Sequence, residues 1–254
     1  MNILNQDLKD QYNKYGVCIL NKFFSKSEMI KIKSYVNFIK LLKPKFGEVM
    51  QYYEKSVLTF KKRDVLIRSE FFYDYHKGLK KLLDSAKIKK HLKLLLGKEC
   101  ILFKEKINYK PSGARADKLH QDSQSDWEKY SREFISVLIS VEKSTKLNGC
   151  LEFDFSGNNC FKLIGKMWKP LKINELHKPK FKNVELDVGD VVFFNSYVPH
   201  RSKPNLSNNS RAQIYVTYNK KTDGNFRKKY FDAKRVSYPP NNERLLGVNY
   251  KYKV

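Results

Sequence analysis

Two histidines and one aspartate stand at positions that could hold a metal ion. His120 and Asp122 are separated by one residue, and His200 follows roughly eighty residues later. On an extended backbone the side chains at i and i+2 point to the same face, so His120 and Asp122 can share one site. Two histidines and one carboxylate bind non-haem Fe(II) on one face and leave its other positions open for a co-substrate and oxygen. The pattern predicts a catalytic metal site at these three residues.

An arginine behind the second histidine suggests a partner for the metal. Arg211 lies eleven residues after His200, at the start of the apolar run 212–216. A guanidinium that enters a barrel from the next strand can bind a carboxylate through two parallel hydrogen bonds, as the distal end of 2-oxoglutarate requires. Ser202 could add a hydroxyl group to the same carboxylate. A His-x-Asp pair alone occurs by chance, but His-x-Asp, a Gly-Asp turn, His and Arg in this order form a specific combination.

Four segments resemble the phytanoyl-CoA dioxygenase family. They are His120-Gln121-Asp122, Asn148-Gly149-Cys150-Leu151, the run from Val188 to Phe194, and the stretch from His200 to Arg211. The resemblance covers roughly residues 100–220. It implies an iron- and 2-oxoglutarate-dependent dioxygenase, built on an all-β core with flanking helices: a double-stranded β-helix, or jelly-roll, cupin-like barrel. Its implied cofactor is Fe(II), with 2-oxoglutarate and O2 as co-substrates.

Segments 196–206, 215–219 and 234–240 are similar to a bacterial branch of the family that includes 2-aminoethylphosphonate dioxygenases. This similarity implies hydroxylation of a small, charged organic substrate with release of succinate and CO2. Because Asp122 is present, with no glycine or alanine in its place, halogenation is disfavoured. An acyl-CoA or a secondary metabolite is also compatible with the family.

The residues expected to meet such a substrate carry both signs of charge and one aromatic ring. Lys106 and Arg201 offer cations for an acid group, and Asp126 and Glu152 offer carboxylates for an amine. Trp127, in the same polar loop as Asp126, could equally be a core residue or a wall of the substrate site. The mouth of the barrel is therefore expected to carry both signs of charge.

A predicted strand over residues 101–110 carries basic side chains on one face. Its alternation places Lys104, Lys106, Asn108 and Lys110 together. Such a face either lies in solvent or lines the site. Because 2-oxoglutarate is a dianion, Lys106 and Asn108 would contact it if they point inward, and the resemblance implies that contact for Asn108. Lys104 is a further candidate for binding the co-substrate.

Hydrophobic periodicity predicts the elements that position these residues. A helix is predicted from a cap at Ser25 or Ser27 to the breaker at 44–47, because apolar residues recur there at helical spacing. Residues 57–60 could form a strand, and 63–68 could begin a helix. Strands are otherwise predicted over 15–20, 134–141, 151–155 and 191–195, two short helices over 79–96, a tail helix over 226–235, and a lid or flank over 156–180.

Length and composition favour a folded protein of one domain. The 254 residues contain 41% hydrophobic and 14% aromatic residues, which excludes a disordered chain. The interpretation is one domain over 1–254, with a helical flank at about 1–99, a barrel core at about 100–220 and a tail at 221–254. No apolar run approaches the roughly twenty residues that span a bilayer. The N-terminus lacks a signal-peptide pattern and the four cysteines lack metal spacing, so a cytoplasmic protein with reduced thiols is expected.

The remaining histidines are not expected to bind metal. His76 and His91 have no acidic or histidine partner at ligand spacing, and His177 is less well placed than His200. Asp190 is expected to be a turn residue.

The net charge of +25 raises the possibility of a nucleic-acid partner. Lysine is spread along the whole chain rather than gathered in one tract, which favours a solvated basic surface. The expected partner is therefore a small-molecule substrate, with no specific nucleic acid and no membrane, and the sequence does not indicate an oligomeric state. Two alternatives remain open: a nucleic-acid-modifying 2-oxoglutarate oxygenase and a non-catalytic barrel that only binds.

Overall fold

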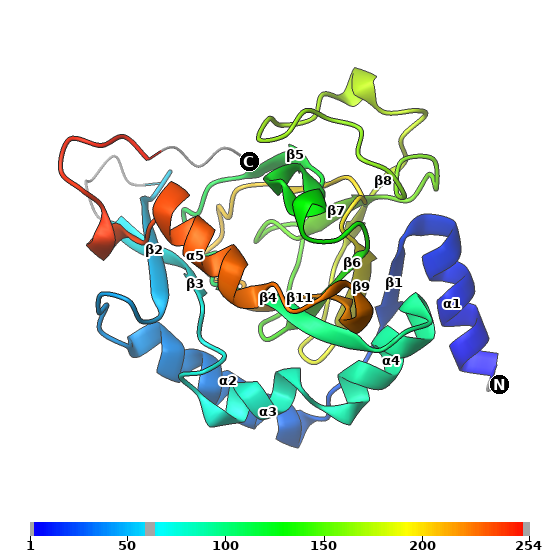
Figure 1. Ribbon diagram of the computed structural model, residues 1–254, viewed down its shortest axis with the longest axis horizontal. Coiled ribbons are helices and arrows are strands. Elements are labelled where there is room, and N and C mark those ends of the chain that lie inside the picture. The colour runs from blue at the N-terminus through cyan, green and yellow to red at the C-terminus, as the bar shows by residue number, and fades with distance from the viewer. Residues whose placement is uncertain (1–2, 59–63, 251–254) are drawn as a thin grey trace.

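A computed structural model describes residues 3–58 and 64–250 of the chain (Figure 1). The strands are β1 (Val17–Leu20), β2 (Met50–Lys55), β3 (Asp64–Glu70), β4 (Cys100–Asn108), β5 (Asp117–His120), β6 (Phe134–Ser140), β7 (Leu151–Asp154), β8 (Phe181–Val184), β9 (Val191–Asn195), β10 (His200–Ser202) and β11 (Gln213–Lys220). The α-helices are α1 (Ile3–Tyr15), α2 (Lys26–Leu41), α3 (Lys77–Leu83), α4 (Ala86–Leu96) and α5 (Arg227–Ser237). Short 3-10 helices are η1 (Asp122–Ser125), η2 (Trp127–Lys129), η3 (Ile173–Glu175), η4 (Lys221–Asp223) and η5 (Asn241–Glu243).

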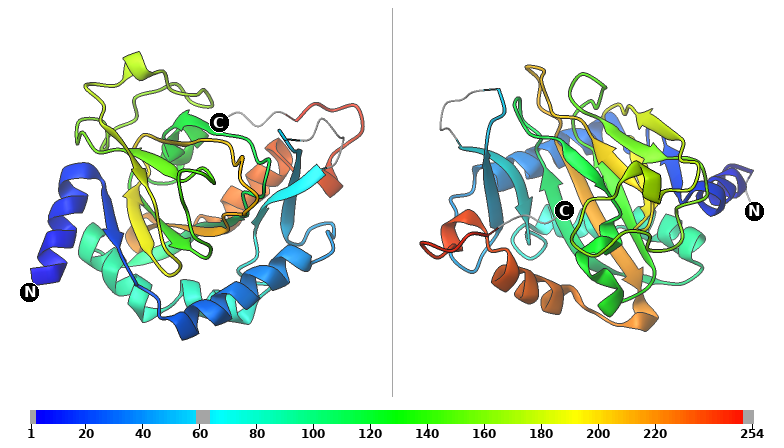
Figure 2. Two further views of the ribbon diagram at one scale, coloured as in Figure 1. Left: turned by 180° about the vertical axis from the view of Figure 1, so that it is seen from behind. Right: turned by 90° about the horizontal axis from the view of Figure 1, so that it is seen from above.

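The strands form two antiparallel sheets. The larger has the order β1-β9-β6-β11-β4-β3-β2, and the smaller has the order β5-β10-β7-β8. Helices α2, α3 and α4 lie along one side of the molecule, and the yellow-green segment 156–180 lies on the opposite side (Figure 2). This arrangement confirms the predicted double-stranded β-helix with flanking helices. Strands β1, β2 and β3 join the larger sheet, so the predicted helical flank at 1–99 also contributes three strands.

Strand alternation divides the core into two layers. In β6, the fully buried strand that the sequence predicts, Leu138 packs with Phe153 and Phe194 between the two sheets. Its neighbours Val137 and Ile139 belong instead to the cluster that includes buried residues of α2, α3 and α4. A strand covered on both faces reads as a continuous apolar run, and this is why β6 lacks polar alternation.

The predicted helices near the N-terminus are confirmed. Ser25 caps α2 through a capping box: its hydroxyl accepts from the Glu28 amide at 3.3 Å, and the Glu28 carboxylate accepts from the Ser25 amide at 2.7 Å. Helices α3 and α4 follow, and α4 ends at Gly97, whose φ of 70° is the left-handed conformation that glycine adopts without strain.

Two predictions for the first seventy residues differ from the structure. Residues 64–70 form strand β3 and not the start of a helix, because β3 pairs with β4 and places Arg68 opposite Asn108. Val57 and Leu58 lie in a bend rather than a strand, and Thr59 and Phe60 lie outside the described residues. Helix α1 was not among the predicted elements, because its sequence is mostly polar and contains few apolar residues. No helix in the described ranges is long and apolar enough to cross a membrane.

A buried ion pair fastens α5 to the larger sheet. Glu105 of β4 is fully buried, and the Arg227 guanidinium donates to both its oxygens, with Nη2–Oε1 at 2.6 Å and Nε–Oε2 at 3.0 Å. Because Arg227→Met leaves a buried carboxylate without its cation, we expect it to lower the free energy of unfolding by about 3–5 kcal/mol. Urea denaturation measures this change.

Two further variants make the Arg227 measurement specific. Lys228→Met changes the same charge on the same helix, at a side chain that is 89% exposed, and should shift stability by less than about 0.5 kcal/mol. The double variant Arg227→Met/Glu105→Met should recover most of the loss, since no buried charge remains. Equal losses in the single and double variants would contradict the role of the ion pair.

Candidate active site

The smaller sheet brings the two predicted histidine ligands together. Strands β5 and β10 pair in antiparallel register with His120 opposite His200, and Asp122 begins η1 directly after β5. One ligand atom from each of the three side chains lies within 4.8 Å of the others. Asp122 and His200 are buried, and the His120 side chain is 14% exposed. Two imidazoles and a carboxylate in this geometry fit one ion such as Fe(II).

Backbone carbonyls orient both imidazoles. Nδ1 of His120 lies 2.6 Å from the Lys118 carbonyl oxygen, and Nδ1 of His200 lies 2.9 Å from that of Val198. A carbonyl can only accept, so Nδ1 carries the proton and Nε2 is left as the ligand atom. The Ser136 hydroxyl donates to Asp122 Oδ2 at 3.3 Å and orients the carboxylate in the same way.

The protonation states also suit a metal. Burial, with His200 next to it, lowers the pKa of His120 to about 4. For Asp122 burial acts in the opposite direction, but His200, Lys106 and Lys104 outweigh it and lower the pKa to about 2. At neutral pH, His120 is therefore neutral and Asp122 is ionised, which are the forms that coordinate a cation.

Arg211 lines a cavity that His120 and His200 also line. Its side chain is completely buried, yet Nε, Nη1 and Nη2 have no hydrogen-bond partner among the described residues. Leaving a buried guanidinium unpaired is unfavourable unless an anion fills the space in front of it. We call this space the arginine cavity; it is lined by Glu54, Ile67, Arg68, Lys106, Asn108, Lys110, Ala114, Arg115, Asp117, His120, Leu151, His200, Arg211 and Tyr215.

The inward orientation of the basic face of β4 is observed. Lys106, Asn108 and Lys110 all line the arginine cavity. Lys104 does not; it lines a neighbouring pocket described below. The cavity can therefore hold a dicarboxylate between Arg211 and the metal ligands, but the structure places Lys104 elsewhere than the predicted co-substrate contacts.

Ser202 is engaged in a network that the sequence analysis missed. Its hydroxyl donates to Asp117 Oδ2 at 2.5 Å and accepts from Lys110 Nζ at 2.6 Å. Lys110 also donates to Asp117 and to the Arg115 carbonyl, so all three of its protons are used. The Ser202 proton is thus committed to Asp117 and not directed at a carboxylate held by Arg211. Lys110 follows β4 and was predicted on the same face as Lys106, which could have indicated its role.

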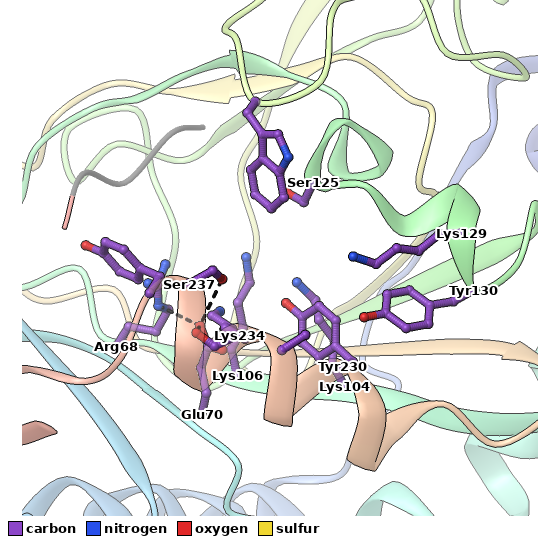
Figure 3. A pocket seen from close by; sticks show the side chains of 13 residues that line it. Arg68, Glu70, Lys104, Lys106, Ser125, Lys129, Tyr130, Tyr230, Lys234 and Ser237 are labelled. Atoms are coloured by element: carbon purple, nitrogen blue, oxygen red, sulfur yellow. Dashed lines mark hydrogen bonds and ion pairs between the residues drawn. The ribbon is translucent and has the colours of Figure 1, made fainter. Parts of the chain in front are cut away.

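A second pocket adjoins the arginine cavity, and Arg68 and Lys106 line both. Figure 3 shows its side chains, which come from β3, β4, the turns after Asp122 and helix α5. We call it the basic pocket; it is lined by Arg68, Glu70, Lys104, Lys106, Ser125, Lys129, Tyr130, Trp168, Tyr230, Ala233, Lys234, Ser237 and Tyr238. Five basic side chains and one carboxylate, Glu70, line it, so both signs of charge are present with an excess of positive charge.

Two of the predicted substrate contacts lie on the wrong side of the sheet. Arg201 Nε donates to Glu152 Oε2 at 2.8 Å, and neither residue lines the basic pocket or the arginine cavity. The reason is strand alternation: His200 points into the barrel, so Arg201 points out, where it meets Glu152 of the paired strand β7.

Two more of the five predicted contacts, Asp126 and Trp127, are engaged with other side chains. Asp126 pairs with Lys129 at 2.7 Å. Trp127 is fully buried and packs edge-on against Phe103 and Phe134, which makes it a core residue, the first of its two predicted alternatives. Of the substrate residues predicted, the structure leaves Lys106 beside both cavities.

The turn role expected for Asp190 is confirmed. Asp190 accepts hydrogen bonds from the amides of Lys22 and Asp187, as a turn residue does. His76 caps α3, and neither it nor His91 or His177 belongs to a metal-binding group among the described residues. All four cysteines are free thiols.

The backbone of segment 156–180 is hydrogen-bonded to two glutamine side chains that lie next to the metal ligands in the sequence. Gln121, between the two ligands of β5 and η1, donates to the Lys162 carbonyl at 2.8 Å and accepts from the Ile164 amide at 2.8 Å. Gln124 donates to the carbonyls of Lys166 and Lys169 at 2.9 and 2.7 Å. These bonds hold Trp168 where it lines the basic pocket. The segment is therefore a flank that borders the site.

Comparison with known proteins identifies the family. The model of the phytanoyl-CoA dioxygenase family matches residues 12–213. The chain belongs to this family. It is an iron- and 2-oxoglutarate-dependent dioxygenase, and the alternative of a non-catalytic barrel is set aside.

Relatives in this family include enzymes named for phosphonates. The chain is 34% identical to the 2-aminoethylphosphonate dioxygenase of the uncultured bacterium HF130_AEPn_1, over 98% of this chain and 95% of the relative. It is 29% identical to the methylphosphonate hydroxylase of Gimesia maris, over 90% and 86%. The crystal structure of the epimerase SnoN in complex with Fe3+, alpha ketoglutarate and nogalamycin RO shares the fold, with a TM-score of 0.71, 13% identity, and coverage of 98% of this chain and 93% of that one.

Proposed function

We propose that this dioxygenase hydroxylates a small anionic substrate of the aminophosphonate type. One observation carries the proposal: the basic pocket, with Lys104 and Lys106 in its lining, adjoins the arginine cavity that His120 and His200 line. A substrate that neutralises these cations would lie next to the metal ligands. Relatives named for 2-aminoethylphosphonate and methylphosphonate support an organophosphorus acid as that substrate.

In this proposal the arginine cavity binds the co-substrate and the basic pocket binds the substrate. His120, Asp122 and His200 would hold Fe(II), which supplies oxygen activation coupled to decarboxylation of 2-oxoglutarate. Arg211, with Asn108 and Lys106, would hold the co-substrate, and the basic pocket would hold the substrate. The balanced reaction converts a C–H bond, 2-oxoglutarate and O2 into a C–OH bond, succinate and CO2. The protein contributes ligands, orientation and a site closed to bulk water.

Hydroxylation of a nucleic acid is the weaker alternative. Enzymes that modify a base extrude it from the stack and read it by hydrogen bonding and aromatic stacking in a pocket. A pocket lined by five basic side chains suits an anion inside it rather than an uncharged base. The basic exterior then reflects composition, and phosphate binding to it would be non-specific.

Succinate release from 2-oxoglutarate separates the two alternatives. At moderate salt, an aminophosphonate should stimulate release above the uncoupled rate, and a methylated oligonucleotide should not. Rising salt should abolish DNA binding through counterion release but change small-substrate turnover much less, because buried charges are screened less. Stimulation by the oligonucleotide alone would overturn the proposal and favour nucleic-acid modification.

A further inference from the structure

Lys104 is unusual among the cations of the basic pocket. It is 8% exposed, and the described residues offer its ammonium group neither a hydrogen bond nor an ion pair. Its Nζ lies over two rings instead, 4.2 Å from the centroid of Trp127 and 5.6 Å from that of Tyr230. An ammonium group has three protons to donate, and apart from these two ring faces the described residues offer it no acceptor, so an anion in the pocket can accept them.

Four other charged groups of the pocket are already paired, three of them with one another. Arg68 Nε lies 2.7 Å from Glu70 Oε1, and Lys234 pairs with the second oxygen of Glu70. Lys129 pairs with Asp126 outside the pocket at 2.7 Å. Glu70, the one carboxylate among the described lining residues, therefore has both oxygens occupied.

The surroundings of Lys104 favour an anion of more than one charge. Burial lowers the pKa of Lys104, and the neighbouring ammonium groups of Lys106 and Lys234 lower it further. An anion placed between Lys104 and Lys106 would remove that repulsion and accept the unused protons. Tyr230 and Trp127 would remain as apolar walls beneath the ammonium.

We infer that Lys104 is the principal receptor for the dianionic head group of the substrate, and that no carboxylate of the pocket is available to bind a substrate amine. The inference rests on the proposed function and deepens it, since it states that the pocket binds the phosphonate group of the substrate and does not bind its amine. A phosphonate in its dianionic form is consequently distinguished from a sulfonate of the same shape, which carries a single negative charge. An alkylphosphonate without an amine is expected to bind as well as its amino analogue.

Direct titration tests this assignment without iron. Ethylphosphonate and ethanesulfonate are titrated calorimetrically into the metal-free protein. Excess 2-oxoglutarate is present, so that it occupies Arg211 and the added anions do not bind there. Wild-type protein should bind ethylphosphonate more tightly than ethanesulfonate. Lys104→Met keeps the aliphatic stem beside Trp127 but removes the charge, and should weaken ethylphosphonate binding at least about tenfold while it abolishes the preference over sulfonate.

Two controls show that the change is local. Lys228→Met makes the same substitution at an exposed position of α5 and should leave binding unchanged. Lys104→Met should keep its thermal transition, which shows that the variant folds. Equal ethylphosphonate affinity in wild type and Lys104→Met, or no phosphonate binding to either, would overturn the inference.

Succinate release by the enzyme loaded with Fe(II) distinguishes a failure of the Lys104 assignment from a failure of the proposed function. If phosphonates stimulate release equally in wild type and Lys104→Met, the function stands and the receptor assignment fails. If ethylphosphonate binding depends on Lys104 but no phosphonate stimulates release, the receptor assignment stands and the proposed function fails.

Discussion

Asp122→Ala is expected to abolish metal binding and substrate-driven succinate release together. Asp122 offers the one carboxylate in the group formed with His120 and His200, and its lowered pKa keeps it ionised at neutral pH. Removing a residue that only orients a ligand already weakens metal binding about 10- to 100-fold, so loss of a ligand itself should exceed that range. Turnover should fall at least in proportion, because two imidazoles without the charge hold a divalent ion poorly.

The measurement is calorimetric titration with Mn(II), which does not oxidise as Fe(II) does, followed by the succinate assay. Asp232→Ala is a matched control, since it removes an exposed carboxylate on α5 and should change neither result. Wild-type Mn(II) affinity in Asp122→Ala would remove Asp122 from the proposed ligand set.

Arg211→Lys should raise the KM for 2-oxoglutarate by about 10- to 100-fold, the loss expected for one charged hydrogen bond. Lysine keeps the charge but cannot form two parallel hydrogen bonds to a carboxylate. The KM for the prime substrate should change much less, because Arg211 lines the arginine cavity and not the basic pocket.

Stability gives an independent signature of the same role. Arg211 is fully buried and unpaired, so Arg211→Met should not lower the free energy of unfolding when 2-oxoglutarate is absent. Added 2-oxoglutarate should raise the melting temperature of wild type but not of this variant. Arg132→Lys, at an exposed position, serves as the control for both measurements. An unchanged KM for 2-oxoglutarate would place the carboxylate anchor elsewhere, with Lys106 the next candidate among the cations that line the cavity.

The sequence by itself determined those features that depend only on residues close together along the chain. The i, i+2 spacing of His120 and Asp122 placed both on one face, and alternation along β4 placed Lys106 and Asn108 together. Helical periodicity and the cap at Ser25 predicted α2 for the same reason. These signals are local because backbone geometry sets the direction of each side chain from its position in the element.

Alternation could also have prevented one error. With His200 assigned to the inside of the barrel, Arg201 must face outward, yet it was expected at the mouth beside Glu152. Strand β10 has only three residues and so shows no periodicity of its own, whereas β4 is long enough to show it.

Only the tertiary structure decided the composition of the two cavities. Arg68 and Glu70 reach the basic pocket because β3 pairs with β4, and Lys234 reaches it because α5 packs against that strand, 130 residues beyond Lys104. Equally little in the sequence indicated that no described residue pairs with the charged groups of Arg211 and Lys104. Whether a buried cation has a partner depends on every element packed around it, and these elements are brought together by long-range sheet pairing and burial, which no local spacing encodes.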